Sequence, residues 1–206
     1  MRSECIVIND FYDNPDEIRK YALKDDWYQP YGEESPWHSS QNVYKPDFII
    51  NKFFSNLNTN IDLNHWNNDT EYNGRFHTKL ENVGMGYHDH VIDLDFNGVG
   101  KDGWSCVVFL NPLTPIEQGI FTAKPKSKPK LRPGKNNIFL DDYPNECKGR
   151  HCDINHMHYE HDIFIGNVYN RAVAFRGDIW HTGSPGFGNL IENGRMIQTF
   201  FFKEQK

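Results

Sequence analysis

Cysteine and long apolar runs are both scarce in this sequence. Its 206 residues include four cysteines, too few for the disulfide framework of a secreted domain, and Cys106 lies in the apolar stretch WSCVVFL, where a buried thiol is expected. No segment approaches the ~18 consecutive apolar residues of a membrane span, and the opening residues MRSECIVINDF lack the apolar core of a signal peptide. We therefore expect a soluble protein of the cytoplasm.

An excess of positive charge is also missing. Lysine and arginine number 22 against 28 aspartates and glutamates, which gives a formal net charge of −6. Such a protein does not bind nucleic acid or an acidic membrane by overall electrostatic attraction. A membrane partner is therefore not expected, and a nucleic-acid partner is not indicated. No internal repeat is visible, and the length suits one core, so we predict a single domain over residues 1–206.

The first third of the chain has helical spacing, whereas the rest does not. A short apolar strand, ECIVINDFY, precedes a helix that should begin at Asn14 and Pro15, a favourable N-cap and first-turn pair. Residues 28–42 are rich in Gly, Pro and Ser and are predicted to form a loop. A second helix is predicted from the spacing of Phe48, Ile49, Phe53 and Leu57. Short apolar runs after Trp66 then predict a mainly β fold with N-terminal helices, a sandwich or jelly roll.

Residues at about 123–166 interrupt the β pattern and are predicted to form an insertion. The segment AKPKSKPKLRPGK is basic and proline-rich, and CKGRHCDINHMHYEHD follows it with closely spaced cysteines and histidines. The basic strip could steer an anionic substrate or a phosphate backbone toward a nearby site. A solvated loop kept extended by its prolines accounts for the same residues more simply.

Two clusters compete as a metal site. In the first, His88, Asp89, His90 and Asp93 lie together in YHDHVIDLD, and His181 is available from a distant strand. Residues i and i+2 of an extended segment project to one side, so His88 and His90 can share one ion. With a third ligand from the remote strand, half of an octahedron stays open, as in the facial triad of non-heme iron oxygenases.

The second cluster lies in the predicted insertion. Its two cysteines have C-x4-C spacing and no second close pair accompanies them, which does not match common zinc modules. We interpret its members as solvated loop residues, with a structural zinc as the weaker alternative. They are Cys147, His151, Cys152, His156, His158 and His161.

Three stretches give the chain a resemblance to a known family. From GYHDH through WSCVVFLNPLTPIEQGIF to NVYNRAVAFRGDIWHTGSPGFGNLIENGRMIQTFFF, it resembles the iron(II)/2-oxoglutarate-dependent dioxygenase superfamily, in particular the small oxygenase-like proteins often encoded by phages and bacteria. The segment VINDFYDNPDEIRKYAL is similar to the opening of the same proteins. The most specific part is an aspartate-rich turn, His181, GFG, and Arg195 fourteen residues after that histidine.

The resemblance implies a double-stranded β-helix, a cupin-like jelly roll, that binds iron(II). It implies an enzyme that uses 2-oxoglutarate and dioxygen to hydroxylate a substrate that the sequence does not identify. His88 would be the first metal ligand and His181 the distal one. Arg195 would hold the far carboxylate of 2-oxoglutarate, for which a guanidinium has matching paired donors.

Two further expectations concern the walls of the pocket. In RMIQTFFF, Arg195, Ile197 and Thr199 should share one face of the strand. Trp104 and Trp180 are candidates for pocket walls, although core aromatics would have the same sequence context.

The chain departs from the family's His-x-Asp pattern at the second ligand, where His90 stands in place of the aspartate. Three alternatives follow. His90 binds and gives a three-histidine site of His88, His90 and His181, which we favour; a shifted Asp93 or Asp89 supplies the carboxylate; or the site is vestigial. A vestigial site would leave a non-catalytic binding module, and a metal in the second cluster would instead make a zinc-stapled interaction protein.

Overall fold

The computed structural model describes residues 5–30, 32, 37–67, 72–81, 87–91, 98–126 and 159–205. Within them lie three helices, α1 (Pro15–Leu23), α2 (Phe48–Leu57) and α3 (Leu63–Asn67). The strands of these residues are β1 (Cys5–Ile8), β2 (Trp27–Tyr28), β3 (His38–Ser40), β4 (Phe76–Lys79), β5 (Trp104–Phe109), β6 (Ile120–Pro125), β7 (Tyr159–Ile165), β8 (Ala172–Arg176), β9 (Trp180–Gly183) and β10 (Arg195–Phe202).

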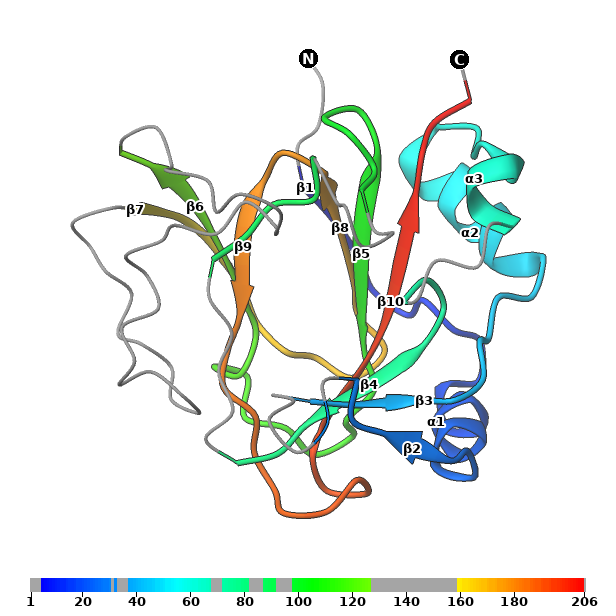
Figure 1. The fold of residues 1–206 in the computed structure, drawn as a ribbon, viewed down its shortest axis with the longest axis vertical. Helices are drawn as coiled ribbons and strands as arrows, with labels where there is room; N and C mark the ends of the chain where they lie inside the picture. The colour runs from blue at the N-terminus through cyan, green and yellow to red at the C-terminus, as the bar shows by residue number, and fades with distance from the viewer. Residues whose placement is uncertain are drawn as a thin grey trace.

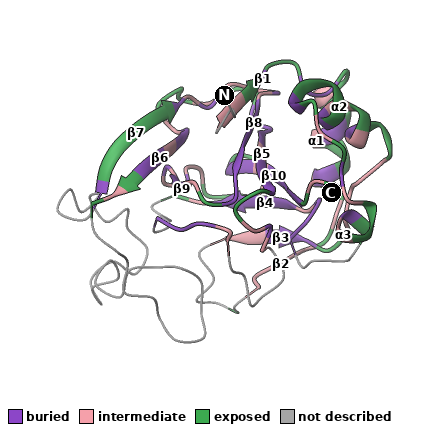
Figure 2. Cartoon of the chain, turned by 90° about the horizontal axis from the view of Figure 1, so that it is seen from above, coloured by how far each residue is buried: buried purple, intermediate pink, exposed green. Residues whose placement is uncertain are grey.

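The strands form two antiparallel sheets (Figure 1). The larger sheet has the order β1-β8-β5-β10-β4-β3-β2, and the smaller one has the order β7-β6-β9. The strands at the centre of the larger sheet are almost entirely buried, whereas β7 at the edge of the smaller sheet is largely exposed (Figure 2).

From β4 onward the chain passes back and forth between the two sheets. β4 and β5 belong to the larger sheet, and between them residues 87–91 approach β9 of the smaller sheet, where His88 pairs with His181. β6 and β7 form the smaller sheet with β9, while β8 and β10 return to the larger one. This alternation is a double-stranded β-helix, so the predicted mainly β jelly roll with N-terminal helices is confirmed.

Alternate residues of β10 separate the main core from the interior of the jelly roll. Phe200 and Phe202 pack with Ile49 and Phe53 of α2 in the largest hydrophobic cluster. Successive side chains of a strand point to opposite faces. The odd-numbered residues of β10 therefore point inward and line a cavity: Arg195, Ile197, Thr199 and Phe201. The helices therefore cover the outer face of the larger sheet (Figure 1) and leave its inner face for a site.

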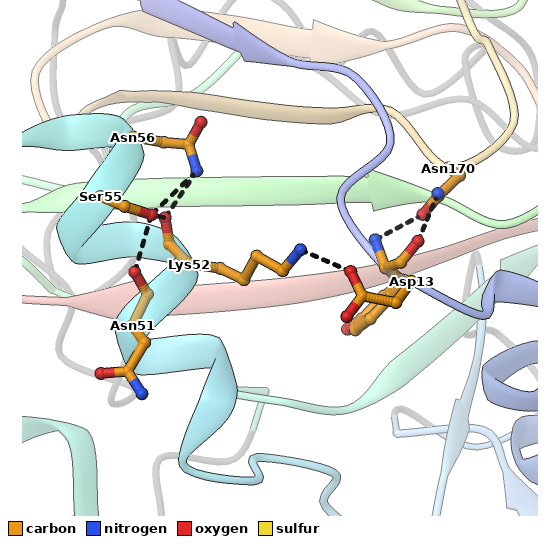
Figure 3. A network of polar contacts seen from close by, with 7 residues as sticks. Asp13, Asn51, Lys52, Ser55, Asn56 and Asn170 are labelled. Carbon is orange, nitrogen blue, oxygen red and sulfur yellow. Dashed lines mark hydrogen bonds and ion pairs between the residues drawn. The ribbon is translucent and has the colours of Figure 1, made fainter.

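Polar contacts hold α2 and the segment after β1 together (Figure 3). The ammonium group of Lys52 lies 2.7 Å from the carboxylate of Asp13. Asn170, which precedes β8, donates from its side-chain amide to the carbonyl of Tyr12 and accepts the Tyr12 N–H, both at 2.8 Å. Exposed ion pairs contribute little, so the buried Asn170 bonds contribute more, and they fix the segment between β1 and α1 to the residues before β8.

Both predicted N-terminal helices are present. α1 begins at Pro15 after Asn14, although the Asn14 side chain makes no capping hydrogen bond. α2 buries Ile49, Phe53 and Leu57, while Phe48 is exposed. The apolar spacing therefore identified the buried face of α2 correctly at three positions of four.

The predictions for two segments need correction. Residues 28–42 are not all loop, because β2 and β3 pair with each other and β3 pairs with β4, which extends the larger sheet. This pairing is tertiary, and residues poor in β propensity join a sheet when a neighbouring strand supplies the partners. The predicted insertion at about 123–166 includes the end of β6 and all of β7. Residues 127–158 between them lie outside the described residues.

The structure tests what the scarcity of cysteines and of long apolar runs predicted. Cys106 is fully buried in β5, as predicted, and it is a free thiol. Burial also raises the pKa of the free thiol of Cys5 to about 11. Among the described residues, none of the helices combines the length and the apolar character needed to cross a membrane.

Candidate metal centre

Three histidines from two distant segments meet inside the jelly roll. His88 and His181 form a two-way backbone pair, in which each N–H donates to the other's carbonyl at 3.1 and 3.0 Å. His90 follows two residues after His88 and is anchored by its N–H to the Gly177 carbonyl at 2.7 Å. One ligand atom from each of the three imidazoles lies within 4.8 Å of the other two. The i, i+2 spacing thus places His88 and His90 on the side that faces His181.

The ring of His181 is held in the orientation and tautomer that a metal ligand needs. Its Nδ1 lies 2.9 Å from the carbonyl oxygen of Ile179. A carbonyl only accepts hydrogen bonds, so Nδ1 carries the proton and Nε2 keeps its lone pair. A backbone carbonyl in this position is a frequent support of metal-binding histidines.

His90 and His181 are held in their neutral form. Burial, followed by the neighbouring His88, lowers the pKa of His90 well below its ordinary value. Burial and then His88 and His90 lower the pKa of His181 in the same direction. Neutral imidazole is the state that donates a lone pair to a metal.

The two candidate aspartates have different outcomes. Asp89 is buried, and its carboxylate accepts the backbone N–H of Val91 at 3.1 Å, so it stabilises the turn that follows the ligand segment. The group of potential ligands that the described residues contain does not include it. Asp93 lies outside the described residues.

A cavity of about 150 Å³ opens beside the three histidines. The basic side chains of Lys79 and Arg195 line it. The aromatic side chains of Trp37, Tyr72 and Phe201 line it as well, and the ring of Phe201 lies 4.9 Å from that of His90. A pocket that combines basic and apolar side chains suits an organic anion next to a metal.

Arg195 is buried and held in a fixed orientation. Its Nε and Nη2 donate to the carbonyls of Gln118 and Gly119 at 3.1 and 3.0 Å. Gly183 of β9 makes room for the guanidinium, because a Cβ there would lie 3.2 Å from Nη1. Burial lowers the pKa of Arg195 to about 10, so it stays charged at neutral pH. Ile197 and Thr199 line the same cavity, as their shared strand face predicts.

Lys79 is a cavity residue that sequence reasoning missed. It ends β4 directly opposite Arg195 of β10, and it is 5% exposed. Burial, followed by the charge of Arg195, lowers the pKa of Lys79 to about 7. In FHTK, the alternation of side chains along a strand places His77 and Lys79 on one face, and this was the sequence signal that could have identified Lys79.

His77 was also missed, and it forms part of a buried hydrogen-bond chain. The hydroxyl of Thr199 donates to the carbonyl of Tyr72 at 2.8 Å, so Thr199 accepts the proton of His77 Nε2 at 3.0 Å. Nδ1 of His77 then accepts from the Ser39 hydroxyl at 2.8 Å. Burial, followed by Arg75, lowers the pKa of His77 to about 3. This histidine is therefore a neutral element of the cavity wall.

The pH dependence of stability should reveal the neutral His77. Unfolded His77 gains a proton below pH 6.5 and the folded residue does not until about pH 3, so its contribution is fully present above pH 6.5 and is lost as the pH falls. We expect the stability gap between wild type and His77→Gln to shrink by about 1 kcal/mol from pH 7.5 to 5.5. Urea unfolding of metal-free protein at both pH values measures it, and a constant gap would contradict a neutral His77.

The two tryptophans expected at the pocket lie elsewhere. Trp104 is in the main core, where the Arg176 guanidinium lies 3.8 Å from its ring and Glu204 accepts its indole N–H. Trp180 packs with Tyr159 in a separate cluster. Neither lines the cavity, because each occupies the outward face of its strand. Trp37 is the indole that does line it.

Of the second predicted metal cluster, only His161 falls within the described residues. It is exposed on β7, with its ring 5.8 Å from that of Phe121. The remaining members, Cys147, His151, Cys152, His156 and His158, lie outside the described residues, so the zinc alternative stays a prediction.

Comparisons with known proteins add a structural likeness. No protein-family model matches the sequence, and no curated protein matches it. The chain is similar in structure to HygX from Streptomyces hygroscopicus, solved with nickel, 2-oxoglutarate and hygromycin B bound, with 14% identity, a TM-score of 0.49, and coverage of 98% of this chain and 83% of that one. It is also similar to a Pseudomonas putida prolyl-4-hydroxylase, with 12% identity, a TM-score of 0.48, and coverage of 98% and 94%. Likenesses at this level assign no ligand or activity to this chain.

Proposed function

We propose that this protein is an iron(II)- and 2-oxoglutarate-dependent oxygenase that hydroxylates a C–H bond of a small or macromolecular substrate. His88, His90 and His181 would hold the metal, and Arg195 would hold the far carboxylate of 2-oxoglutarate. The observation that carries the proposal is the convergence of three imidazoles, whose ligand atoms lie within 4.8 Å of one another, on a cavity that Lys79 and Arg195 also line.

The donor set fits a divalent transition metal. Imidazole suits iron as well as zinc, copper and nickel, and the carbonyl of Ile179 leaves Nε2 of His181 free to bind. Three protein ligands would leave coordination positions open for a bidentate cosubstrate and for dioxygen. When bound, iron(II) supplies the activation of dioxygen and the oxidative decarboxylation of 2-oxoglutarate.

The replacement of the usual aspartate by His90 changes the charge of the site. Three neutral imidazoles leave the full double charge of a divalent ion, whereas a carboxylate ligand would cancel half of it. None of the described residues that line the cavity is acidic. A ligand with two carboxylates supplies the missing negative charge, and this supports 2-oxoglutarate over a neutral cosubstrate.

The chain's own side chains position the reactants and exclude water. Arg195 is oriented by two carbonyls before any ligand arrives, so little reorganisation is needed when a carboxylate binds. Ile197, Phe175 and Phe201 form apolar parts of the cavity wall. Removal of water strengthens the attraction between the guanidinium and a carboxylate.

Metal analysis and a turnover assay test the proposal together. Protein purified without chelator and loaded anaerobically with iron(II) should convert 2-oxoglutarate to succinate when dioxygen is admitted, even without a primary substrate, at a slow uncoupled rate. Bound iron with no succinate formed would contradict the proposal. Tight zinc retained by a cavity that does not turn over 2-oxoglutarate would instead support a binding module on the same fold.

A further inference from the structure

Lys79 and Arg195 form an unusual pair of charges inside the cavity. They are directly opposite in the register of β4 and β10, and both are buried, at 5% and 1% exposure. Residues directly opposite on antiparallel strands have their side chains on one face, with Cβ atoms about 4.5–5.5 Å apart. Two basic side chains therefore lie side by side where little water can screen them, and burial together with Arg195 lowers the pKa of Lys79 to about 7, so a bound anion would favour its charged form.

The described residues provide no carboxylate for this pair. The cavity-lining residues among them include no aspartate or glutamate, and the ion pairs of the described part of the chain use other groups. Like charges directly opposite each other destabilise a sheet, and a buried charge without a partner is costly. Both costs are removed when an anion binds between the two cations.

The donors that remain for such an anion come from both residues. Two carbonyls already use Nε and Nη2 of Arg195, which leaves Nη1 without a hydrogen bond to a described residue. The ammonium group of Lys79 has three N–H donors, and Lys79 lines the cavity beside Arg195. Arg195 is thus an oriented but partly occupied donor, and Lys79 supplies the donors that it lacks.

We propose that Lys79 is the second cation of one anion-binding subsite and that, together with Arg195, it selects ligands with a carboxylate at the end remote from the metal. The ligand class is the small dicarboxylates. The identification of 2-oxoglutarate as the natural member of that class rests on the proposed function. The binding of a dicarboxylate does not, because the two cations act whether or not a metal is present.

Glutarate in the presence of a chelator isolates this subsite. It has the two carboxylates of 2-oxoglutarate but lacks the keto group, so it cannot chelate a metal as 2-oxoglutarate does. Calorimetry should compare wild type with Lys79→Met, with Lys79→Arg and with Lys101→Met, which removes an exposed lysine from the turn before β5. We expect Lys79→Met to weaken glutarate binding about 30-fold or more, Lys79→Arg to retain most of it, and Lys101→Met to leave it unchanged.

The thermal stability of the ligand-free variants distinguishes a binding lysine from a structural one. Removal of a like charge beside Arg195 should raise the melting temperature of Lys79→Met, whereas the loss of a merely structural contact would lower it. If Lys79→Met does not fold, Lys79→Gln is measured in its place. Equal glutarate affinity in wild type and in the Lys79 variants, or no glutarate binding to metal-free wild type, overturns the proposal.

The outcome is separate from that of the proposed function. An oxygenase assignment that fails, with no succinate formed from 2-oxoglutarate, leaves the glutarate result standing, because glutarate binding requires neither iron nor dioxygen. Conversely, succinate production with unchanged glutarate affinity in Lys79→Met would overturn the role of Lys79 alone.

Discussion

Replacement of His181 with alanine should abolish stoichiometric iron binding while the fold is retained. The imidazole is the candidate ligand from β9, and the other residues of that strand, Trp180, Thr182 and Gly183, include no histidine, cysteine or carboxylate that could replace it. Removal of groups that only support a ligand lowers metal affinity by about 10- to 100-fold, and removal of the ligand itself should exceed that. Iron analysis after gel filtration and circular dichroism measure both quantities.

His161→Ala is the matched control, because His161 is an exposed histidine on β7 of the same sheet. It should leave iron binding unchanged. Metal lost from His161→Ala but retained by His181→Ala would locate the ion in the Cys- and His-rich segment and would contradict the site inside the jelly roll.

Replacement of Arg195 with methionine should weaken 2-oxoglutarate binding by about 2 to 4 kcal/mol, the range for loss of one partner of a buried charged pair. Arg195 is 1% exposed and lines the same cavity as the three histidines, so a carboxylate that binds there exchanges its hydration for charged hydrogen bonds. Calorimetry with iron replaced by a redox-inactive divalent ion measures the loss without turnover.

Two comparisons separate the loss of binding from a loss of structure. Arg171→Met removes an arginine that bonds Asn9 and Gly166 outside the cavity, and it should bind 2-oxoglutarate as wild type does. Arg195→Met also frees the carbonyls of Gln118 and Gly119, so its unfolding should be measured alongside. Equal affinity in Arg195→Met and wild type would contradict the assignment.

The candidate ligands could be predicted from two kinds of sequence feature: the spacing of nearby residues, and a longer motif that resembles a known family. The i, i+2 spacing of His88 and His90 predicts a shared side in any extended segment, and the structure brings both to His181. Arg195 was reached through its distance from His181 in a family-like pattern. The helical part was predictable from the apolar spacing that buries Ile49 and Phe53.

The features that were missed depend on contacts across the sheets. Lys79 gains its role from register with Arg195, and no spacing within FHTK reveals which strand lies opposite. Trp104 was misjudged because WSCVVF is apolar at nearly every position, so nothing in it distinguishes the core face from the cavity face. Trp180 is different: it directly precedes His181 on β9, and strand alternation alone places it on the opposite face.

The three-histidine site is tested most directly by the iron content of two variants, His90→Ala and Asp93→Asn, loaded anaerobically with iron(II) beside wild type. His90 is one of the three converging imidazoles, and Asp93 is the carboxylate that could replace it as a ligand. The site described above predicts that His90→Ala loses its iron and that Asp93→Asn retains it stoichiometrically. Iron retained by His90→Ala and lost from Asp93→Asn would contradict it and would make the site one of two histidines and a carboxylate.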